Sequence, residues 1–272
     1  MKYSEMVPSP HLAHFVKCFW SLEQSKFAVA DTPELIVPDG CVEIVFNLAD
    51  RYQRFHSDSS VEIQPASIIA GQMNKSVLIR PTGNVNLFGI RFQPAGAYPF
   101  FDFPLYELNG RIEGIDAVLG AAGTVVEEKI NEANSFAERV EAFEILLTNR
   151  LTGNKKIDTI LNRAVAMICR NQGTIPVDSV ARISGISERG LERKFKQKAG
   201  LSPKLFSRIV RFQNVLKFLK NNKTGNVSDT ALSFGYFDQS HMIHEFKEFS
   251  GKSPNAFIGD SHRMTELFTA GD

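Results

Sequence analysis

The residues best suited to specific chemistry lie on a short helix that is predicted to begin just after Ser187. Arg189, Glu192 and Arg193 share one polar face of it, because residues three and four apart lie side by side on a helix. An arginine can donate two hydrogen bonds to the acceptors of guanine, and a glutamate can accept one from the amino group of cytosine. The spacing therefore indicates contact with the edges of DNA bases.

A second, less basic helix about 50 residues further on offers polar side chains for the same task. On it we expect Met242 to face inward and Asp238 to cap the first turn. The candidates for reading bases are Arg189, Glu192, Arg193, Gln239, Ser240, His241, Ile243 and His244. The candidates for phosphate contacts, which supply affinity without sequence preference, are Lys196, Lys204, Lys247 and Lys252. A purely structural role is the alternative for each of them.

These residues belong to a unit that the sequence contains twice. Val177, Ala181 and Gly185 recur after 50 positions, and a further set recurs after 51, namely Phe195, Gly200, Ser202, Pro203 and Phe206. Each copy predicts a helix, a Gly-containing turn and a second helix, at about residues 176–199 and 227–250. This is the helix-turn-helix, whose second helix can enter the major groove of DNA. A single copy could equally be a packed helical hairpin, but the duplication and the positive charge favour DNA binding.

The tandem pattern resembles the DNA-binding domain of AraC/XylS-type transcription regulators over about residues 157–258. The first copy carries Ser-x-Arg-x-Leu-x-Arg-x-Phe from Ser187 and Gly-x-Ser-Pro from Gly200. The second carries Ala-x3-Gly-Tyr-x-Asp-Gln-Ser-His-Met-x2-Glu-Phe from Ala231 and Gly-x-Ser-Pro from Gly251. The resemblance implies two helix-turn-helix units that a long helix joins, both facing one side of DNA, in a bacterial sequence-specific transcription regulator.

The charge of the chain changes sign near residue 154. Residues 1–154 hold 12 Lys and Arg against 19 Asp and Glu, a net charge of −7, and residues 155–272 hold 19 against 11, a net charge of +8. A basic half joined to an acidic half indicates a DNA-binding module fused to a different domain. We therefore expect a sensor or dimerisation domain at residues 1–152, a linker at 153–156, the DNA-binding domain at 157–260 and a tail at 261–272.

The first half is predicted to be rich in β-structure. Short apolar runs separated by Gly, Pro and Asn predict strands near residues 11–22, 35–37, 41–46, 67–73, 76–80 and 85–92. Such spacing is typical of a β-barrel or a curled sandwich, and the AraC resemblance implies a cupin-like barrel. The expected fold class is therefore α+β in two domains: an N-terminal β-rich cupin-like barrel with trailing helices at about 112–151, and a C-terminal all-α tandem helix-turn-helix domain.

Three features of the first half leave alternatives open. A predicted helix after Ser135 bears one apolar stripe, which either packs on the barrel or pairs with its copy in a homodimer; its residues are Phe136, Val140, Phe143, Leu147 and Leu151. The aromatic stretch 98–106 could line an apolar pocket, although packing in the core is favoured. Arg80 and Arg91 could bind an anionic effector, although a surface or structural ion pair is favoured for each.

The alternative function is an enzyme, of the DNA-repair kind, fused to a DNA-binding domain. It would need an activated cysteine, and Cys18, Cys41 and Cys169 have no neighbouring ligand or base motif. We therefore expect no enzyme activity, no catalytic residue, no metal and no cofactor. The odd, widely spaced cysteines and the lack of a membrane-length apolar run predict a cytoplasmic protein. The expected partners are double-stranded DNA, RNA polymerase, a small-molecule effector and a second copy of the chain, with no membrane.

Overall fold

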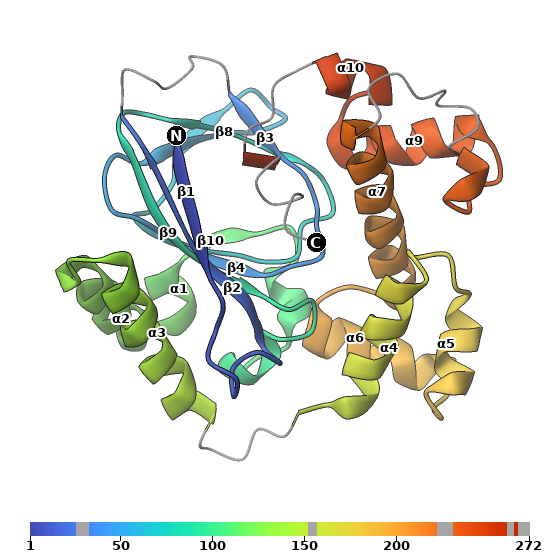
Figure 1. Ribbon diagram of the computed structural model, residues 1–272, viewed down its shortest axis with the longest axis horizontal. Helices are drawn as coiled ribbons and strands as arrows, with labels where there is room; N and C mark the ends of the chain where they lie inside the picture. Colours follow the sequence, from blue (N-terminus) through green and yellow to red (C-terminus); the bar gives the residue numbers. More distant parts are fainter. Residues whose placement is uncertain (26–32, 152–156, 222–230, 260–263, 266–272) are drawn as a thin grey trace.

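Two facing β-sheets form most of the N-terminal half, in a computed structural model that describes residues 1–25, 33–151, 157–221, 231–259 and 264–265 (Figure 1). Neighbouring strands are antiparallel. The six-stranded sheet has the order β1-β2-β9-β4-β7-β10, with the bounds Lys2–Met6, Val16–Gln24, Val85–Phe92, Glu43–Asn47, Ser67–Ala70 and Ile112–Gly114. The four-stranded sheet has the order β3-β8-β5-β6, with the bounds Glu34–Ile36, Val77–Pro81, Tyr52–Phe55 and Val61–Ile63.

The two sheets confirm the β-rich first half but correct the picture of a barrel. Among the described strands, no hydrogen-bonded pair joins one sheet to the other, so the strands do not close into one ring. Closure needs an unbroken ladder around the barrel, and the edge strands β3, β6 and β10 are only three residues long. The prediction of β9 was correct, whereas β1, β5, β6 and β10 were not predicted because they lack a continuous apolar run.

Alternation along the strands gives the six-stranded sheet two different faces. In β4, Ile44 and Phe46 enter the core on one face, while Glu43 and Val45 line a cavity between the sheets on the other. The short 3-10 helices η2 (Tyr98–Phe100) and η3 (Leu105–Leu108) follow β9. The sheet therefore separates an apolar core from a cavity that contains charged groups.

Helices cover the apolar face of the six-stranded sheet. They are α1 (Ile115–Leu119), α2 (Ala121–Glu132) and α3 (Phe136–Leu151). The ring of Phe143 on α3 lies 6.0–6.5 Å from the rings of Phe19, Phe46 and Phe88 on the sheet. The apolar stripe of this helix therefore packs on the sheet, which decides between the two alternatives left open by the sequence.

The start of α3 forms as predicted, through a reciprocal cap. The Ser135 hydroxyl accepts a hydrogen bond from the Glu138 amide at 3.2 Å, and the Glu138 carboxylate accepts one from the Asn134 amide at 2.9 Å. Two backbone donors that a helix leaves unpaired are thereby satisfied.

The C-terminal half is helical. Its helices are α4 (Thr159–Arg170), α5 (Val177–Ile183), α6 (Glu188–Ala199), α7 (Pro203–Asn221), α9 (Gln239–Ser250) and α10 (Pro254–Gly259). The turns before α6 and α9 contain Gly185 and Gly235, whose φ angles of 71° and 72° favour glycine. The first unit thus has the predicted helix, turn and helix, and in the second unit residues 231–233 are helical and lead through the turn into α9. The predicted start of the second unit, residues 227–230, and the predicted linker 153–156 lie outside the described residues.

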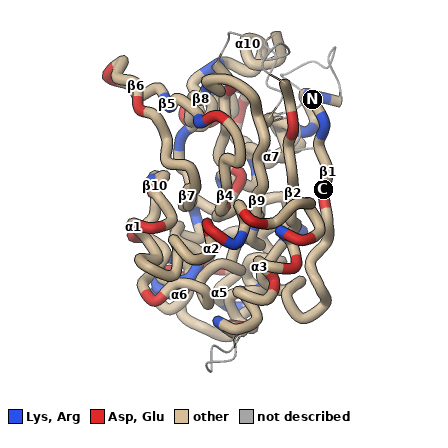
Figure 2. The backbone as a smooth tube through the Cα atoms, turned by 90° about the vertical axis from the view of Figure 1, so that its left-hand side faces the viewer, with Lys and Arg blue, Asp and Glu red and all other residues tan. Residues whose placement is uncertain are grey.

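Figure 2 views the molecule from the side of the N-terminal half. Along the backbone in this view, Asp and Glu are interspersed with Lys and Arg.

Removal of the Phe143 ring should destabilise the fold strongly. Phe143→Ala leaves a cavity among three aromatic rings, and we expect the free energy of unfolding to fall by about 3–5 kcal/mol. Urea denaturation followed by circular dichroism measures this. Glu141→Ala on the same helix is the control, because that side chain is exposed and its loss should change stability by about 0.5 kcal/mol or less. Equal losses in the two variants would contradict the packing of this helix.

Candidate functional site

Helix α6 presents a polar face and a buried face, as the sequence predicted. Leu191, Phe195 and Ala199 are buried in the core of the C-terminal half. Arg189 and Arg193 are exposed. Ser187 caps the helix, since its hydroxyl accepts a hydrogen bond from the Gly190 amide at 3.1 Å. The first half of α6 therefore offers its arginines to solvent.

Two other candidates on α6 interact with each other. The Lys196 ammonium lies 3.3 Å from the Glu192 carboxylate, one helical turn apart. Both side chains are largely exposed, so this pair adds little stability and can open when a phosphate or base approaches.

Helix α9 also has the predicted orientation. Met242 is fully buried, and the Asp238 carboxylate accepts a hydrogen bond from the His241 amide at 2.7 Å. The exposed candidates are Gln239, Ser240, His241, His244 and Lys247. Ile243 and Lys252 are partly buried, and Lys204 is exposed in the first turn of α7.

Helix α7 sets the distance between the two units. It has 19 residues, which corresponds to about 28 Å of helix. Figure 1 shows α6 near one end of α7 and α9 near the other. The length of α7 is therefore of the order of one turn of DNA, about 34 Å.

A buried carboxylate fixes α9 against α7, and the sequence analysis did not identify it. Glu245 is 2% exposed and accepts a hydrogen bond from the Arg208 Nε at 2.7 Å and from the Tyr236 hydroxyl at 2.9 Å. The Arg211 Nη2 lies 3.2 Å from the same carboxylate. Burial alone would raise the pKa of Glu245, but hydrogen bonds from the two arginines hold it below its usual value. The feature of the sequence that could have revealed this site is the pair Arg208 and Arg211, which are three residues apart on a predicted helix.

Asp158 links α6 to the N-terminal half and was also missed. Its carboxylate caps α4 through the Leu161 amide and accepts hydrogen bonds from Lys194 and Lys198 of α6 at 2.7 and 2.8 Å. The Asp158 amide donates to the Tyr98 hydroxyl at 2.9 Å, and the Lys198 ammonium lies 4.8 Å from the centre of the Tyr98 ring. The second half of α6 is therefore held by Asp158 of the C-terminal half and by Tyr98 of the N-terminal half, while its first half is exposed.

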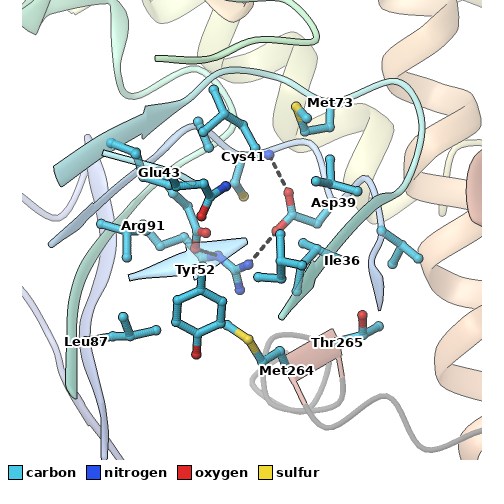
Figure 3. Close-up of a pocket in the computed structure, with 18 of the residues that line it drawn as sticks. Ile36, Asp39, Cys41, Glu43, Tyr52, Met73, Leu87, Arg91, Met264 and Thr265 are labelled. Carbon is cyan, nitrogen blue, oxygen red and sulfur yellow. Dashed lines mark hydrogen bonds and ion pairs between the residues drawn. The ribbon is translucent and has the colours of Figure 1, made fainter. Parts of the chain in front are cut away.

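A cavity of about 100 Å³ lies between the sheets (Figure 3). Most of its wall is apolar, and its charged side chains are Arg91, Asp39 and Glu43. The Arg91 Nη2 lies 2.5 Å from the Asp39 carboxylate, and its Nε lies 2.8 Å from the Glu43 carboxylate. Burial opposes the charge on Arg91, but the two carboxylates raise the pKa of its guanidinium. Arg91 thus forms the structural ion pair that the sequence favoured, and it also faces the cavity.

The turn at Pro38–Gly40 joins this cavity to α7. The Gln213 side chain on α7 donates a hydrogen bond to the Pro38 carbonyl at 2.5 Å. A Cβ atom at Gly40 would lie only 2.9 Å from the Phe206 ring of α7. Between these two contacts, Asp39 turns toward Arg91. One turn therefore contacts the cavity on one side and the helix that joins the two units on the other.

The remaining candidates of the first half are structural. Arg80 donates to the Gln53 side chain at 2.8 and 3.2 Å and lies over the Phe55 ring. The aromatic stretch 98–106 does not line the cavity between the sheets. Its residues Phe100, Phe101 and Leu105 are buried in the core, where Phe100 and Phe101 border a void of about 10 Å³. Packing, which the sequence favoured for this stretch, is confirmed.

The enzyme alternative gains no support from the cysteines of the first half. Burial raises the pKa of the Cys18 thiol to about 11 and that of Cys41 above its usual value. A nucleophilic cysteine needs the opposite shift. Over the part of the chain that the structure describes, no group of three His, Cys, Asp or Glu side chains is placed to hold a metal ion. None of the described helices is both long enough and apolar enough to span a bilayer.

Two family models match the chain. Residues 180–259 match a model described as "Helix-turn-helix domain", and residues 4–113 match a "Domain of unknown function (DUF6597)". The first match confirms the resemblance predicted from the sequence. The C-terminal half carries a helix-turn-helix domain of the AraC type, which is the DNA-binding domain of transcription regulators.

Individual relatives were also found. An uncharacterized HTH-type transcriptional regulator from Haemophilus influenzae is 28% identical over 104 residues, 38% of this chain and 34% of that protein. The matching part thus spans about a third of that relative's length. ToxT from Vibrio cholerae is similar in structure over 89% of this chain and 98% of its own, with 10% identity and a TM-score of 0.48. A ToxT structure with an unsaturated fatty acid bound covers 88% and 93%, with 8% identity and a TM-score of 0.43.

The carboxylate of Asp158 should make stability depend on pH. The pKa of Asp158 is about 2, because hydrogen bonds from Lys194 and Lys198 outweigh the effect of burial, whereas a free aspartate titrates near about 3.9. A carboxylate whose pKa is lower in the folded protein than in the unfolded protein stabilises the fold at pH values above its unfolded pKa. This contribution is lost as the pH falls from about 4 to about 2.

Asp158→Asn tests this charge while it keeps a good helix cap. We expect it to lower the free energy of unfolding at neutral pH by about 1 kcal/mol, after allowance for solvent screening, and the difference from the unmodified protein should vanish near pH 2. Urea titrations across this pH range measure it. Asp178→Asn on α5 is the matched control. A difference that stays constant with pH would rule out the ion pairs as its source.

Proposed function

We propose that the chain is a sequence-specific DNA-binding transcription regulator of the AraC type that acts in the cytoplasm. The observation that carries the proposal is the exposed first half of α6, with Arg189 and Arg193, in a helix-turn-helix unit that the chain repeats. A recognition helix contacts base edges with the side chains near its start. The candidate lysines would then contact phosphates.

The roles of the individual residues are part of this proposal. Arg189, Glu192 and Arg193 would read bases through α6. The second unit would read them through Gln239, Ser240, His241, Ile243 and His244 of α9. Lys196, Lys204, Lys247 and Lys252 would supply affinity through phosphates. The domain boundaries near residues 153–156 and 260 belong to the same proposal.

Control by a small-molecule effector is the second part of the proposal. A ligand in the cavity would contact Arg91 or Asp39, and Asp39 lies in the turn that contacts α7. If the ligand moved this turn, the hydrogen bond from Gln213 and the contact with the Phe206 ring would both change. Since α7 joins the two units, such a shift can alter their relative placement and therefore their affinity for DNA.

A second copy of the chain and RNA polymerase complete the proposed partners. Val125 on α2 and Ile145 on α3 are 49% and 54% exposed on the outer side of the helices that cover the sheet. Apolar residues there offer a surface for a symmetric pair.

The proposal is tested by selection of bound sequences from a random DNA library with the full chain. The selected operator and a scrambled version are then titrated by fluorescence anisotropy at several salt concentrations. We expect the operator to bind at least about a thousandfold more tightly than the scrambled DNA, with affinity that falls steeply with salt. Equal affinity for the operator and the scrambled DNA would mean that the chain binds DNA without sequence specificity, which would contradict the proposal.

Arg193 is the sharpest single test of base reading. Arg193→Ala should cost about 1–3 kcal/mol of binding to the operator and should relax the preference at one base pair, because the guanidinium can donate two hydrogen bonds to guanine. Arg193→Lys should restore the loss only in part, since lysine lacks the planar fork. Anisotropy titrations against the operator and its single-base variants measure both effects.

Lys204→Ala provides the contrasting case. This exposed lysine should contribute through a phosphate, so its loss should weaken binding to all sequences alike and lower the salt slope by about one contact. If Arg193→Ala also weakens operator and scrambled DNA equally, Arg193 contacts a phosphate, and its assignment as a base reader is wrong.

A further inference from the structure

Trp20 lines the cavity, and one glycine makes room for its ring. Trp20 on β2 lies opposite Gly89 on β9 in the sheet register. A Cβ atom at Gly89 would lie 2.0 Å from the indole ring, so any other residue there would displace it. The ring therefore lies across β9, close enough to Glu43 on β4 to act against the rise in the pKa of that carboxyl group.

The charged end of the cavity follows from the same register. Arg91 on β9 lies directly opposite Glu43 on β4, and both side chains face the cavity. Asp39 approaches the guanidinium from the turn that follows β3 (Figure 3). Two carboxylates thus share one guanidinium, and the cluster carries a net charge of −1 when all three groups are ionised.

This excess negative charge is buried. The side chains of Glu43 and Asp39 are 15% and 25% exposed, and that of Arg91 is 6% exposed. Burial and the neighbouring Asp39 raise the pKa of Glu43, against the opposing influence of Arg91 and Trp20. An unbalanced buried charge is costly, so the cluster is stabilised by any positive group that enters the cavity.

We propose that the cavity binds a small organic cation, an ammonium or similar group on a short apolar body. The positive group would lie between Glu43 and Asp39 and next to the Trp20 ring, which attracts cations through its face. The body would lie against apolar wall residues such as Val45, Ile68 and Leu87. The role of this ligand as an effector rests on the proposed function. Its binding in the cavity rests on the cavity alone.

An anionic ligand fits this cavity less well. Arg91 already has a carboxylate on its Nε and another on its Nη2, so an anion would add a third negative charge around one guanidinium. The cavity volume of about 100 Å³ also favours a compact ligand of a few carbon atoms over a long chain.

The single tryptophan of the chain makes the test specific to this cavity. Trp20 is the only tryptophan in the sequence and lines the cavity, so its fluorescence reports occupancy there. The full-length protein is titrated at constant ionic strength with n-butylammonium, 1-butanol and butyrate, which each contain four carbon atoms and differ in charge. We expect n-butylammonium to bind at least about tenfold more tightly than either of the others.

A pair of isosteric variants tests the role of the carboxylates. Glu43→Gln removes one negative charge and should reduce the preference for n-butylammonium over butyrate at least about tenfold. Glu113→Gln on β10 is the control, because that side chain is 41% exposed and does not line the cavity. If Glu43→Gln does not fold, as judged by circular dichroism, Asp39→Asn takes its place, since Asp39 is the more exposed partner.

Each outcome supports or overturns the inference. Equal or tighter binding of butyrate or 1-butanol overturns it, as does the absence of any change in Trp20 emission with all three probes. An unchanged preference in both carboxylate variants overturns it too. DNA binding is measured separately, without a probe. If the protein binds the operator but the probes do not bind as expected, only this inference is overturned. If the probes bind as expected but the operator does not, only the proposed function is overturned.

Discussion

The ion pair between Arg91 and Asp39 constrains one of the contacts between the two halves, the one that joins the cavity to α7. It fixes the turn at Pro38–Gly40, which packs against Phe206 and accepts a hydrogen bond from Gln213 on α7. Without a partner, a guanidinium that is 6% exposed would be very costly to bury. The turn is therefore held by electrostatics from the cavity side and by packing from the helix side, so each side responds to a change in the other.

A second set of buried charges determines how the recognition helix α9 lies on α7. Glu245 receives hydrogen bonds from Arg208 and Tyr236 and pairs with Arg211, so its position is set by three partners. Apolar packing alone would allow these helices to slide by small amounts. Directional hydrogen bonds in a medium of low dielectric penalise such sliding, so they give the second unit one orientation.

The two halves of the first recognition helix, α6, have different surroundings. Lys194 and Lys198, in its second half, bind Asp158, while Arg189 and Arg193, in its first half, are exposed. The two arginines were identified as candidates from the sequence, but Lys194 and Lys198 were given no role. Helical periodicity alone does not distinguish them, because the side chain that accepts the lysines lies 36 and 40 residues earlier in the chain.

The sequence by itself determined the tandem helix-turn-helix units, their caps and their buried faces. These are local properties: Ser187 and Asp238 bond to amides three residues ahead, and Met242 and Phe195 follow the helical period. The tertiary structure decided the open pair of sheets, the cavity, and the ion pairs of Arg91, Asp158 and Glu245. All of these join residues that are far apart in sequence. The pairing of Arg91 depends on strand register, and that of Asp158 and Glu245 depends on how the helices of the C-terminal half pack on one another. Neither has a signal in a short window of residues.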